Sequence, residues 1–277
     1  MMIVEEREVL VSCILAVNRL DGFLPVAIDS ILTQTYRNLE LIIIANNCNE
    51  DLWSFLEEIK KTDSRIITRR TSIGQLVFNL NYGIDIARGK YIARMDADDI
   101  SLPTRIEKQI DFLEKHKSVN MLATNFVRIN IADEIISKPI TNTFDNKDIR
   151  KELKYSNPIA HPSLMFRKCD VIKNRGYSWS FWAEDYEYHL RASRNPDYKF
   201  HCLSDVLLHY RVSDSQMTAN NDNIVNYADE SALLYREWII TGDKAYLLRI
   251  ILLSRTFRSV SRPIKNVVRR FFVKKNH

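Results

Sequence analysis

The sequence has few cysteines, and their positions do not suggest a metal site. The chain contains four, Cys13, Cys48, Cys169 and Cys202, scattered without the short spacing of zinc ligands. They do not form the pattern of a disulfide framework either. Because such thiols suit a reducing compartment, we expect a cytoplasmic protein.

Long apolar runs are also lacking. No stretch approaches the ~18 apolar residues that a spanning helix requires, and residues 1–7 are acidic where a signal peptide is basic and apolar. We therefore expect a protein that is neither secreted by that route nor integral to a membrane. Repeats and low-complexity segments are absent from the sequence as well.

Neither sign of charge dominates the composition. Lysine and arginine number 40 against 35 aspartates and glutamates, and no nucleic-acid recognition motif accompanies this mild excess. We therefore predict no nucleic-acid partner. With 277 residues, 45% of them hydrophobic, the chain can bury a full core. This size fits one large domain, or one domain with an appendage, and excludes a disordered chain.

The first part of the chain alternates apolar runs with helical patterns. Strands are predicted at 8–17, 39–45, 65–68 and from residue 91, and helices at 23–35, 51–61 and 75–88. This alternation predicts a mostly parallel α/β sheet with right-handed crossovers, which is a nucleotide-binding architecture in the general sense.

The second part of the chain is less regular. Helices are predicted at 103–116, 146–155, 184–194, 220–240 and 245–260. Strands are predicted at 121–129, with 134–136 as a hairpin partner, at 164–166, near 200 and at 206–210.

Three acids, Asp96, Asp98 and Asp99, follow the strand that begins at Tyr91. Ligands of wound α/β sheets collect beyond the carboxyl ends of the strands, and carboxylates suit Mg²⁺ or Mn²⁺, which can hold a diphosphate. The alternative is a solvated turn in which Ser101 caps the next helix and the acids favour its dipole. The spacing of the acids leaves both interpretations open.

Four ordered blocks, residues 11–18, 27–36, 39–43 and 87–99, resemble the family 2 glycosyltransferases of the GT-A fold. The similarity covers the first 115 residues and extends more weakly to residue 215. It implies an α/β GT-A fold with a mostly parallel central sheet flanked by helices. Its catalytic domain is expected at 1–215, with a nucleotide-sugar-binding half at 1–115 and an acceptor-binding half at 116–215. Residues 216–277 are expected to form a helical, basic, amphipathic extension.

The resemblance assigns roles to the acid run. Asp98 becomes the direct ligand of a divalent cation, Mn²⁺ or Mg²⁺, Asp96 contacts ribose or metal-bound water, and Asp99 supports them. Such a cation neutralises the diphosphate as a leaving group. The residues predicted to bind the donor are Ala16, Asn18, Asn46, Arg70, Asn79, Asp96, Ala97 and Arg211.

The sequence departs from the family after the second strand. The family usually has paired aspartates there, whereas this chain has Ala45, Asn46 and Asn47. The amide of Asn46 offers both a donor and an acceptor, so it can still pair with a uracil edge. The expected donor nucleotide is UDP. The alternative is that Asn46 and Asn47 are ordinary turn formers.

Transfer to a hydroxyl requires a base for the proton of the acceptor. Residues 182–186 resemble the Glu-Asp element of the family, which assigns Asp185 as the base and Glu184 as an acceptor-orienting or helix-start group. The alternative is that both acids only complement a helix N-terminus.

Further acceptor contacts are predicted at His161 and Trp182. His161 lies in a loop between Pro158 and Pro162 that resembles the acceptor side of the family, although a lone histidine can equally be a structural hydrogen-bond partner. Trp182, with Trp179 and Phe181, can stack on a sugar or pack in the core.

Residues 247–277 alternate apolar and basic side chains. A basic amphipathic segment can lie on an anionic membrane, where each basic side chain contributes about 1 kcal/mol. That contact would bring the protein to a lipid-linked acceptor on the cytoplasmic face of the inner membrane. The alternative is a helix packed on the body with a solvated basic end.

These features together predict an inverting, metal-dependent glycosyltransferase. It would move a sugar from a nucleotide donor to a glycan hydroxyl in surface-polysaccharide synthesis, of O-antigen, capsule or lipooligosaccharide. One alternative is a non-catalytic member that binds a sugar nucleotide or docks to a membrane assembly. Another is a sugar nucleotidyltransferase, but residues 18–22 lack the glycine-rich phosphate loop that such an enzyme carries.

Overall fold

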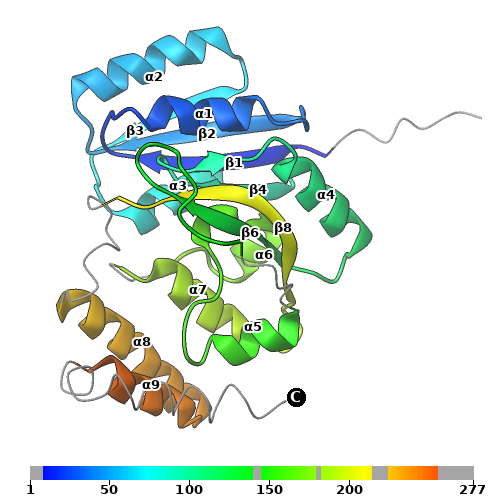
Figure 1. The fold of residues 1–277 in the computed structure, drawn as a ribbon, viewed down its shortest axis with the longest axis vertical. Coiled ribbons are helices and arrows are strands. Elements are labelled where there is room, and N and C mark those ends of the chain that lie inside the picture. Colours follow the sequence, from blue (N-terminus) through cyan, green and yellow to red (C-terminus); the bar gives the residue numbers. More distant parts are fainter. Residues whose placement is uncertain (1–8, 140–144, 179–181, 214–223, 255–277) are drawn as a thin grey trace, which may run out of the picture.

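A single eight-stranded sheet runs through the molecule (Figure 1), with the strand order β3-β2-β1-β4-β7-β6-β8-β5. The computed structural model describes residues 9–139, 145–178, 182–213 and 224–254. The core lies in two hydrophobic clusters, one on each face of the sheet. Helices α1, α2 and α4 cover one face, and α3 and α5 to α9 contribute to the cluster on the other.

The first four strands form a parallel half-sheet that positions the candidate site. They are β1 (Val11–Val17), β2 (Leu39–Asn46), β3 (Ile66–Thr71) and β4 (Tyr91–Met95), joined by α1 (Leu24–Leu32), α2 (Glu50–Thr62) and α3 (Leu76–Ile86). Their pairing is parallel throughout. Strands β1, β2 and β4 are apolar along most of their length because helices cover both of their faces. The predicted alternation of strands and helices is confirmed.

The second half of the domain continues the same sheet. Its elements are β5 (Ile100–Ser101), α4 (Arg105–Lys115), β6 (Met121–Ile129), α5 (Asn146–Glu152), the 3₁₀ helix η1 (His161–Ser163), β7 (Met165–Arg167), α6 (Lys168–Lys173), α7 (Glu184–Ser193) and β8 (Phe200–Arg211). Strand β7 pairs antiparallel with both β4 and β6, so it joins the two halves. Strand β8 pairs parallel with β6.

Strand β8 corrects one prediction. A single strand spans Phe200–Arg211 where the sequence pattern predicted two. The register between β6 and β8 shifts on both sides of Asn125, and the Asn125 amide donates to the Ser204 carbonyl at 3.0 Å. The polar residues that interrupted the apolar pattern therefore occupy an irregularity within the strand, as a bulge allows.

Other elements of the second half also differ from the predictions. The expected hairpin partner at 134–136 does pair with the end of β6, through an antiparallel bridge between Ile129 and Ile135 and backbone hydrogen bonds from Ile136 to Arg128 and from Asn130 to Glu134, but it is too short to count as a strand. Helix α4 begins at Arg105 rather than at residue 103, and the short helix α6 was not predicted. Short elements depend on contacts outside their own sequence, which periodicity does not report.

Helices α8 (Ile224–Thr241) and α9 (Ala245–Leu253) pack onto the second half of the domain. Leu234, Tyr246 and Leu253 lie in the same hydrophobic cluster as Tyr186 of α7. None of the helices among the described residues has the length and apolarity needed to cross a membrane. Residues 255–277, which carry most of the predicted membrane-binding segment, lie outside the described residues.

Candidate active site

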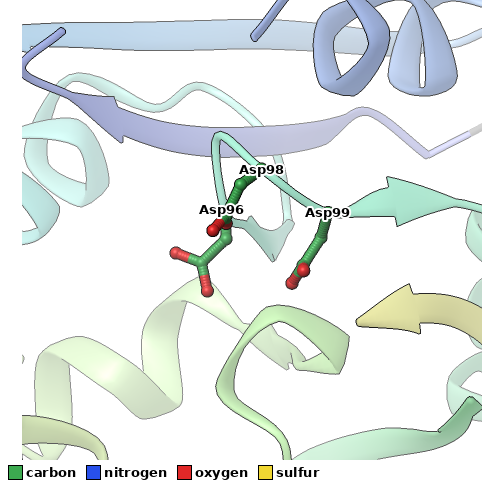
Figure 2. Close-up of side chains that lie close together, drawn as sticks. All are labelled: Asp96, Asp98 and Asp99. Carbon is green, nitrogen blue, oxygen red and sulfur yellow. The ribbon is translucent and has the colours of Figure 1, made fainter. Parts of the chain in front are cut away.

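The three acids that follow β4 converge at the carboxyl end of that strand (Figure 2). Asp96, Asp98 and Asp99 each contribute one carboxylate oxygen to a group whose members all lie within 4.8 Å of one another. Asp99 is buried, and its Oδ1 accepts a hydrogen bond of 2.7 Å from the backbone N–H of Arg211. Its other oxygen, Oδ2, is buried and has no hydrogen-bond partner in the part of the chain that the structure describes.

The electrostatics of this cluster are those of a cation site. Burial raises the pKa of Asp99 well above its usual range, and the charges of Asp96 and Asp98 add to the shift. Burial also raises the pKa of Asp96, which the guanidinium of Arg94 opposes. Converging carboxylate oxygens, one of them unsatisfied, match the ligands that Mg²⁺ and Mn²⁺ prefer. The residues therefore fit a divalent cation.

Arg211 supports the acid loop from within the protein. Its side chain is fully buried, and Nε donates to the carbonyl of Asp98 at 2.7 Å. Nη1 donates to the carbonyl of Asn130 at 2.9 Å, and Nη2 forms a 2.5 Å ion pair with Asp133. These contacts give Arg211 a positioning role in this structure. Its predicted contact with the donor phosphate stays a prediction.

The predicted base-binding residues lie at neighbouring strand ends. Ala16 is half-buried near the end of β1, and Asn18 is exposed directly after that strand. Asn46 ends β2, and its amide donates to the Val17 carbonyl at 3.0 Å, which braces the two strand ends. Asn47 adopts a positive φ of 47°, so it is a turn former.

The side chains of Arg70 and Asn79 bond to other residues of the protein. Arg70 forms an ion pair of 2.7 Å with Glu50. Asn79 is buried, accepts from the Thr71 hydroxyl at 2.6 Å, and donates to two backbone carbonyls of the segment that leads into α3. Asn79 therefore shapes the loop between β3 and α3, and a direct donor contact for either residue stays a prediction. Ala97 is half-buried between the acids.

The predicted catalytic pair opens helix α7. Oδ2 of Asp185 accepts a hydrogen bond of 2.7 Å from the Asn157 amide, whose oxygen lies 3.0 Å from Nδ1 of His189. Oε1 of Glu184 lies 3.5 Å from Nδ1 of His161. Burial raises the pKa of both acids. A carboxylate with a raised pKa is a stronger base, which suits proton abstraction.

His161 is buried, and its Nε2 lies 2.7 Å from the Tyr177 hydroxyl. Burial, together with the charge of Arg94, lowers the pKa of His161 to about 3, so the imidazole is neutral at physiological pH. This environment matches the structural hydrogen-bond role, while the acceptor contact stays a prediction. Trp182 is 37% exposed, and its predicted contact with the acceptor stays a prediction. Trp179 and Phe181 lie outside the described residues.

Arg94 was not predicted to belong to the site. It lies on β4, is 4% exposed, and forms an ion pair with Asp96. Burial raises the pKa of Glu184 and of Asp185, and the charge of Arg94 opposes that rise, so Arg94 acts electrostatically on the acids that open α7 as well as on Asp96. Its Nε has no hydrogen-bond partner among the described residues. A basic residue within a run of buried strand formers was the signal that sequence reasoning missed.

Comparison with known proteins agrees with this geometry. The structure of the *S. aureus* protein TarS, residues 1–349, in complex with UDP-GlcNAc superimposes with a TM-score of 0.67 at 14% identity, over 93% of this chain and 77% of that one. The family model described as "Glycosyl transferase family 2" matches residues 12–176.

Two relatives of similar sequence have names that state a function. The *Escherichia coli* O-antigen biosynthesis glycosyltransferase WbnJ is 38% identical over 251 residues, which are 89% of this chain and 91% of that protein. The *E. coli* UDP-Glc:alpha-D-GlcNAc-diphosphoundecaprenol beta-1,3-glucosyltransferase WfaP is 37% identical over 109 residues, 39% of this chain and 43% of that one.

The fold is therefore that of the GT-A glycosyltransferases. The chain belongs to glycosyl transferase family 2, and it is a glycosyltransferase.

Proposed function

We propose that this protein is an inverting, metal-dependent glycosyltransferase. It transfers a sugar from a UDP-sugar donor to a hydroxyl of a lipid-linked glycan during surface-polysaccharide synthesis. The observation that supports the proposal is the convergence of Asp96, Asp98 and Asp99 beyond β4, together with the acids Glu184 and Asp185 that open α7, of which Glu184 acts electrostatically on Asp96.

The acids that follow β4 and the acids that open α7 have different roles in the proposed reaction. Asp98 with Asp96 would hold a divalent cation, which would supply positive charge to stabilise the departing diphosphate. Asp99 supports the loop through its hydrogen bond with the Arg211 backbone. Asp185 takes the proton from the attacking hydroxyl, and Asn157 orients its carboxylate. Glu184 orients the acceptor, and inversion follows from a single in-line displacement.

The names of relatives support the choice of donor and acceptor. WbnJ is named for O-antigen biosynthesis, and WfaP for glucose transfer from UDP to a GlcNAc on diphosphoundecaprenol. A lipid-linked acceptor requires access to a membrane surface. The basic and apolar side chains of residues 247–277 are suited to an anionic membrane, which extends the proposal to peripheral contact there.

Incubation of the purified protein with a panel of nucleotide sugars and Mn²⁺ tests the proposal. UDP-sugars should raise the melting temperature and support transfer to a diphosphopolyprenyl-linked sugar. Asp98→Asn should abolish Mn²⁺-dependent UDP binding and slow transfer by roughly 100-fold or more, because the lost charge stabilisation is several kcal/mol. Asp205→Asn is the matched control, since Asp205 is a surface carboxylate paired with Lys108.

Two outcomes would contradict parts of the proposal. Survival of both Mn²⁺-dependent UDP binding and transfer in Asp98→Asn would show that the metal assignment is wrong. Binding of nucleotide sugars without hydrolysis or transfer in the unaltered protein would favour a non-catalytic member. Ala45 and Asn46, which replace the paired aspartates usual in the family, are the observation that keeps this second candidate open.

A further inference from the structure

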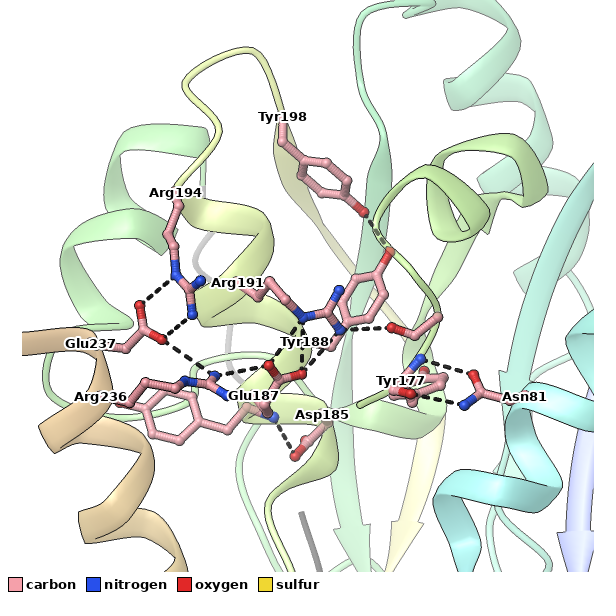
Figure 3. A network of polar contacts seen from close by, with 12 residues as sticks. Asn81, Tyr177, Asp185, Glu187, Tyr188, Arg191, Arg194, Tyr198, Arg236 and Glu237 are labelled. Carbon is pink, nitrogen blue, oxygen red and sulfur yellow. Dashed lines mark hydrogen bonds and ion pairs between the residues drawn. The ribbon is translucent and has the colours of Figure 1, made fainter. Parts of the chain in front are cut away.

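Helix α8 is joined to the catalytic helix α7 by a buried network of charged side chains (Figure 3). Two glutamates lie at its centre, Glu187 of α7 and Glu237 of α8, and each is 0% exposed. Three arginines surround them, Arg191 and Arg194 at the end of α7 and Arg236 on α8.

Arg236 connects the two glutamates. Its Nη2 donates to Oε1 of Glu187 at 2.8 Å and lies 3.4 Å from Oε1 of Glu237. Arg191 also pairs with Glu187, at 3.0 Å, and Arg194 pairs with Glu237, at 2.5 Å. Each buried carboxylate therefore has two arginine partners, and Arg236 is the member that crosses from α8 to the first turn of α7.

A second contact between α8 and this region lies just before the first turn of α7. The backbone N–H of Trp182 donates to Oδ2 of Asp229 on α8 at 3.1 Å. The charge of Asp229 contributes to the raised pKa of Glu184, so it lies near that carboxylate. Helix α8 thus contacts the chain three residues before Asp185 and again two residues after it.

The start of α7 needs such external contacts. Ala183 stands at the N-cap and offers no side-chain hydrogen bond to the helix, so the first turn lacks the usual cap. A buried ion pair contributes little net stability, yet its directional contacts can specify one arrangement of two elements. The network is suited to orienting α7, and not only to stabilising it.

We propose that Arg236 and Asp229 are positioning residues that hold the first turn of α7 in the orientation in which Asp185 faces the acceptor hydroxyl. The helical pair α8–α9 is accordingly part of the acceptor side of the site, and not a separate appendage. This inference rests on the proposed function, because it assumes that Asp185 is the base.

Arg236→Met tests the inference without leaving a buried carboxylate unpaired. Glu187 keeps Arg191 and Glu237 keeps Arg194, so the variant should fold. The rate of transfer to acceptor should fall roughly 10- to 100-fold, as expected when a catalytic group is displaced by about 1 Å. Donor KM and hydrolysis of the donor by water should stay within about 2-fold of the unaltered protein. Arg236→Lys should restore part of the transfer rate.

The ratio of transfer to hydrolysis separates positioning from stability, because partial unfolding lowers both rates equally. Arg249→Met is the matched control, since the Arg249 ion pair of 3.1 Å with Glu230 joins α9 to α8 and not to α7. The control should keep the unaltered ratio. An unchanged ratio in Arg236→Met, or an equal fall in Arg249→Met, overturns the inference. Absence of transfer by the unaltered protein would instead overturn the proposed function.

Discussion

Asp185 and Glu184 are adjacent in sequence but have different surroundings. Asp185 accepts from Asn157, whereas Glu184 lies beside His161. Adjacent helical residues point in different directions, so the two carboxylates are suited to different tasks. The hydrogen bonds from the Asn157 amide and from the Tyr186 backbone N–H fix the orientation of the Asp185 carboxylate, and its role as the base stays a prediction.

Replacement of Asp185 by asparagine should separate binding from chemistry. We expect donor binding to persist and the kcat of transfer to fall by roughly 10² to 10⁴, the usual contribution of a general base. Isothermal titration with UDP and a steady-state transfer assay measure the two effects. Asp51→Asn is the control, because Asp51 lies in the first turn of α2, where its carboxylate complements the helix dipole and accepts a hydrogen bond from Asn49. Full transfer by Asp185→Asn would remove it as the base.

The contacts of Arg211 could not be predicted from the sequence. The acids Asp98 and Asp99 were singled out by their place after a strand and by the family resemblance, but the hydrogen bonds of Arg211 within the protein were not predicted. Its bonds to the Asp98 loop and to Asn130 connect residues 113 and 81 positions apart in the sequence. Such contacts exist only once β8 lies beside β5 and β6.

At the scale of elements, the close approach of β1 and β4 decides where the acid loop lies. Gly89 precedes β4, and its N–H donates to the Ser12 hydroxyl at 2.9 Å. A Cβ atom at this position would lie 2.6 Å from the backbone nitrogen of Ser12 and 2.9 Å from the carbonyl oxygen of Leu10. Backbone atoms cannot yield as a flexible side chain can, so the strands would have to separate.

Gly89→Ala should therefore lower the free energy of unfolding by about 1–3 kcal/mol, the usual cost of overpacking. Gly22→Ala is the control, because a Cβ there meets nothing within 4 Å. That variant should stay within about 0.5 kcal/mol of the unaltered protein. Urea denaturation of the two variants measures the difference. Equal stability would mean that β1 and β4 can separate at no cost.

At the scale of the whole molecule, folding is linked to pH through its buried histidines. Burial lowers the pKa of His161 and of His189 to about 3 each, against the ordinary histidine value of 6.5. Below pH 6.5 the unfolded chain binds protons at these residues and the folded protein does not. Their contribution to stability is therefore present above pH 6.5 and is lost progressively as the pH falls toward 3.

The variant His161→Gln isolates one of these contributions. The buried carboxyl groups of the site, whose raised pKa values favour the folded state as the pH falls, remain in both proteins. The free energy of unfolding of the variant relative to the unaltered protein should rise by about 1.4 kcal/mol per pH unit as the pH falls from 6.5 toward 3. Urea denaturation across this range measures it, and a difference independent of pH would contradict the buried, neutral state of His161.

The order of strands and helices in the first half, and the acids that follow β4, were determined by the sequence itself. Apolar runs, helical spacing and motifs are local, so they can be read without the fold. Only the tertiary structure decided the continuity of β8, the electrostatic effect of Arg94 on the acids that open α7, and the contact of α8 with α7. Each depends on residues that are far apart in the chain and that packing brings together. Arg236 and Glu187, for example, are 49 positions apart in the sequence.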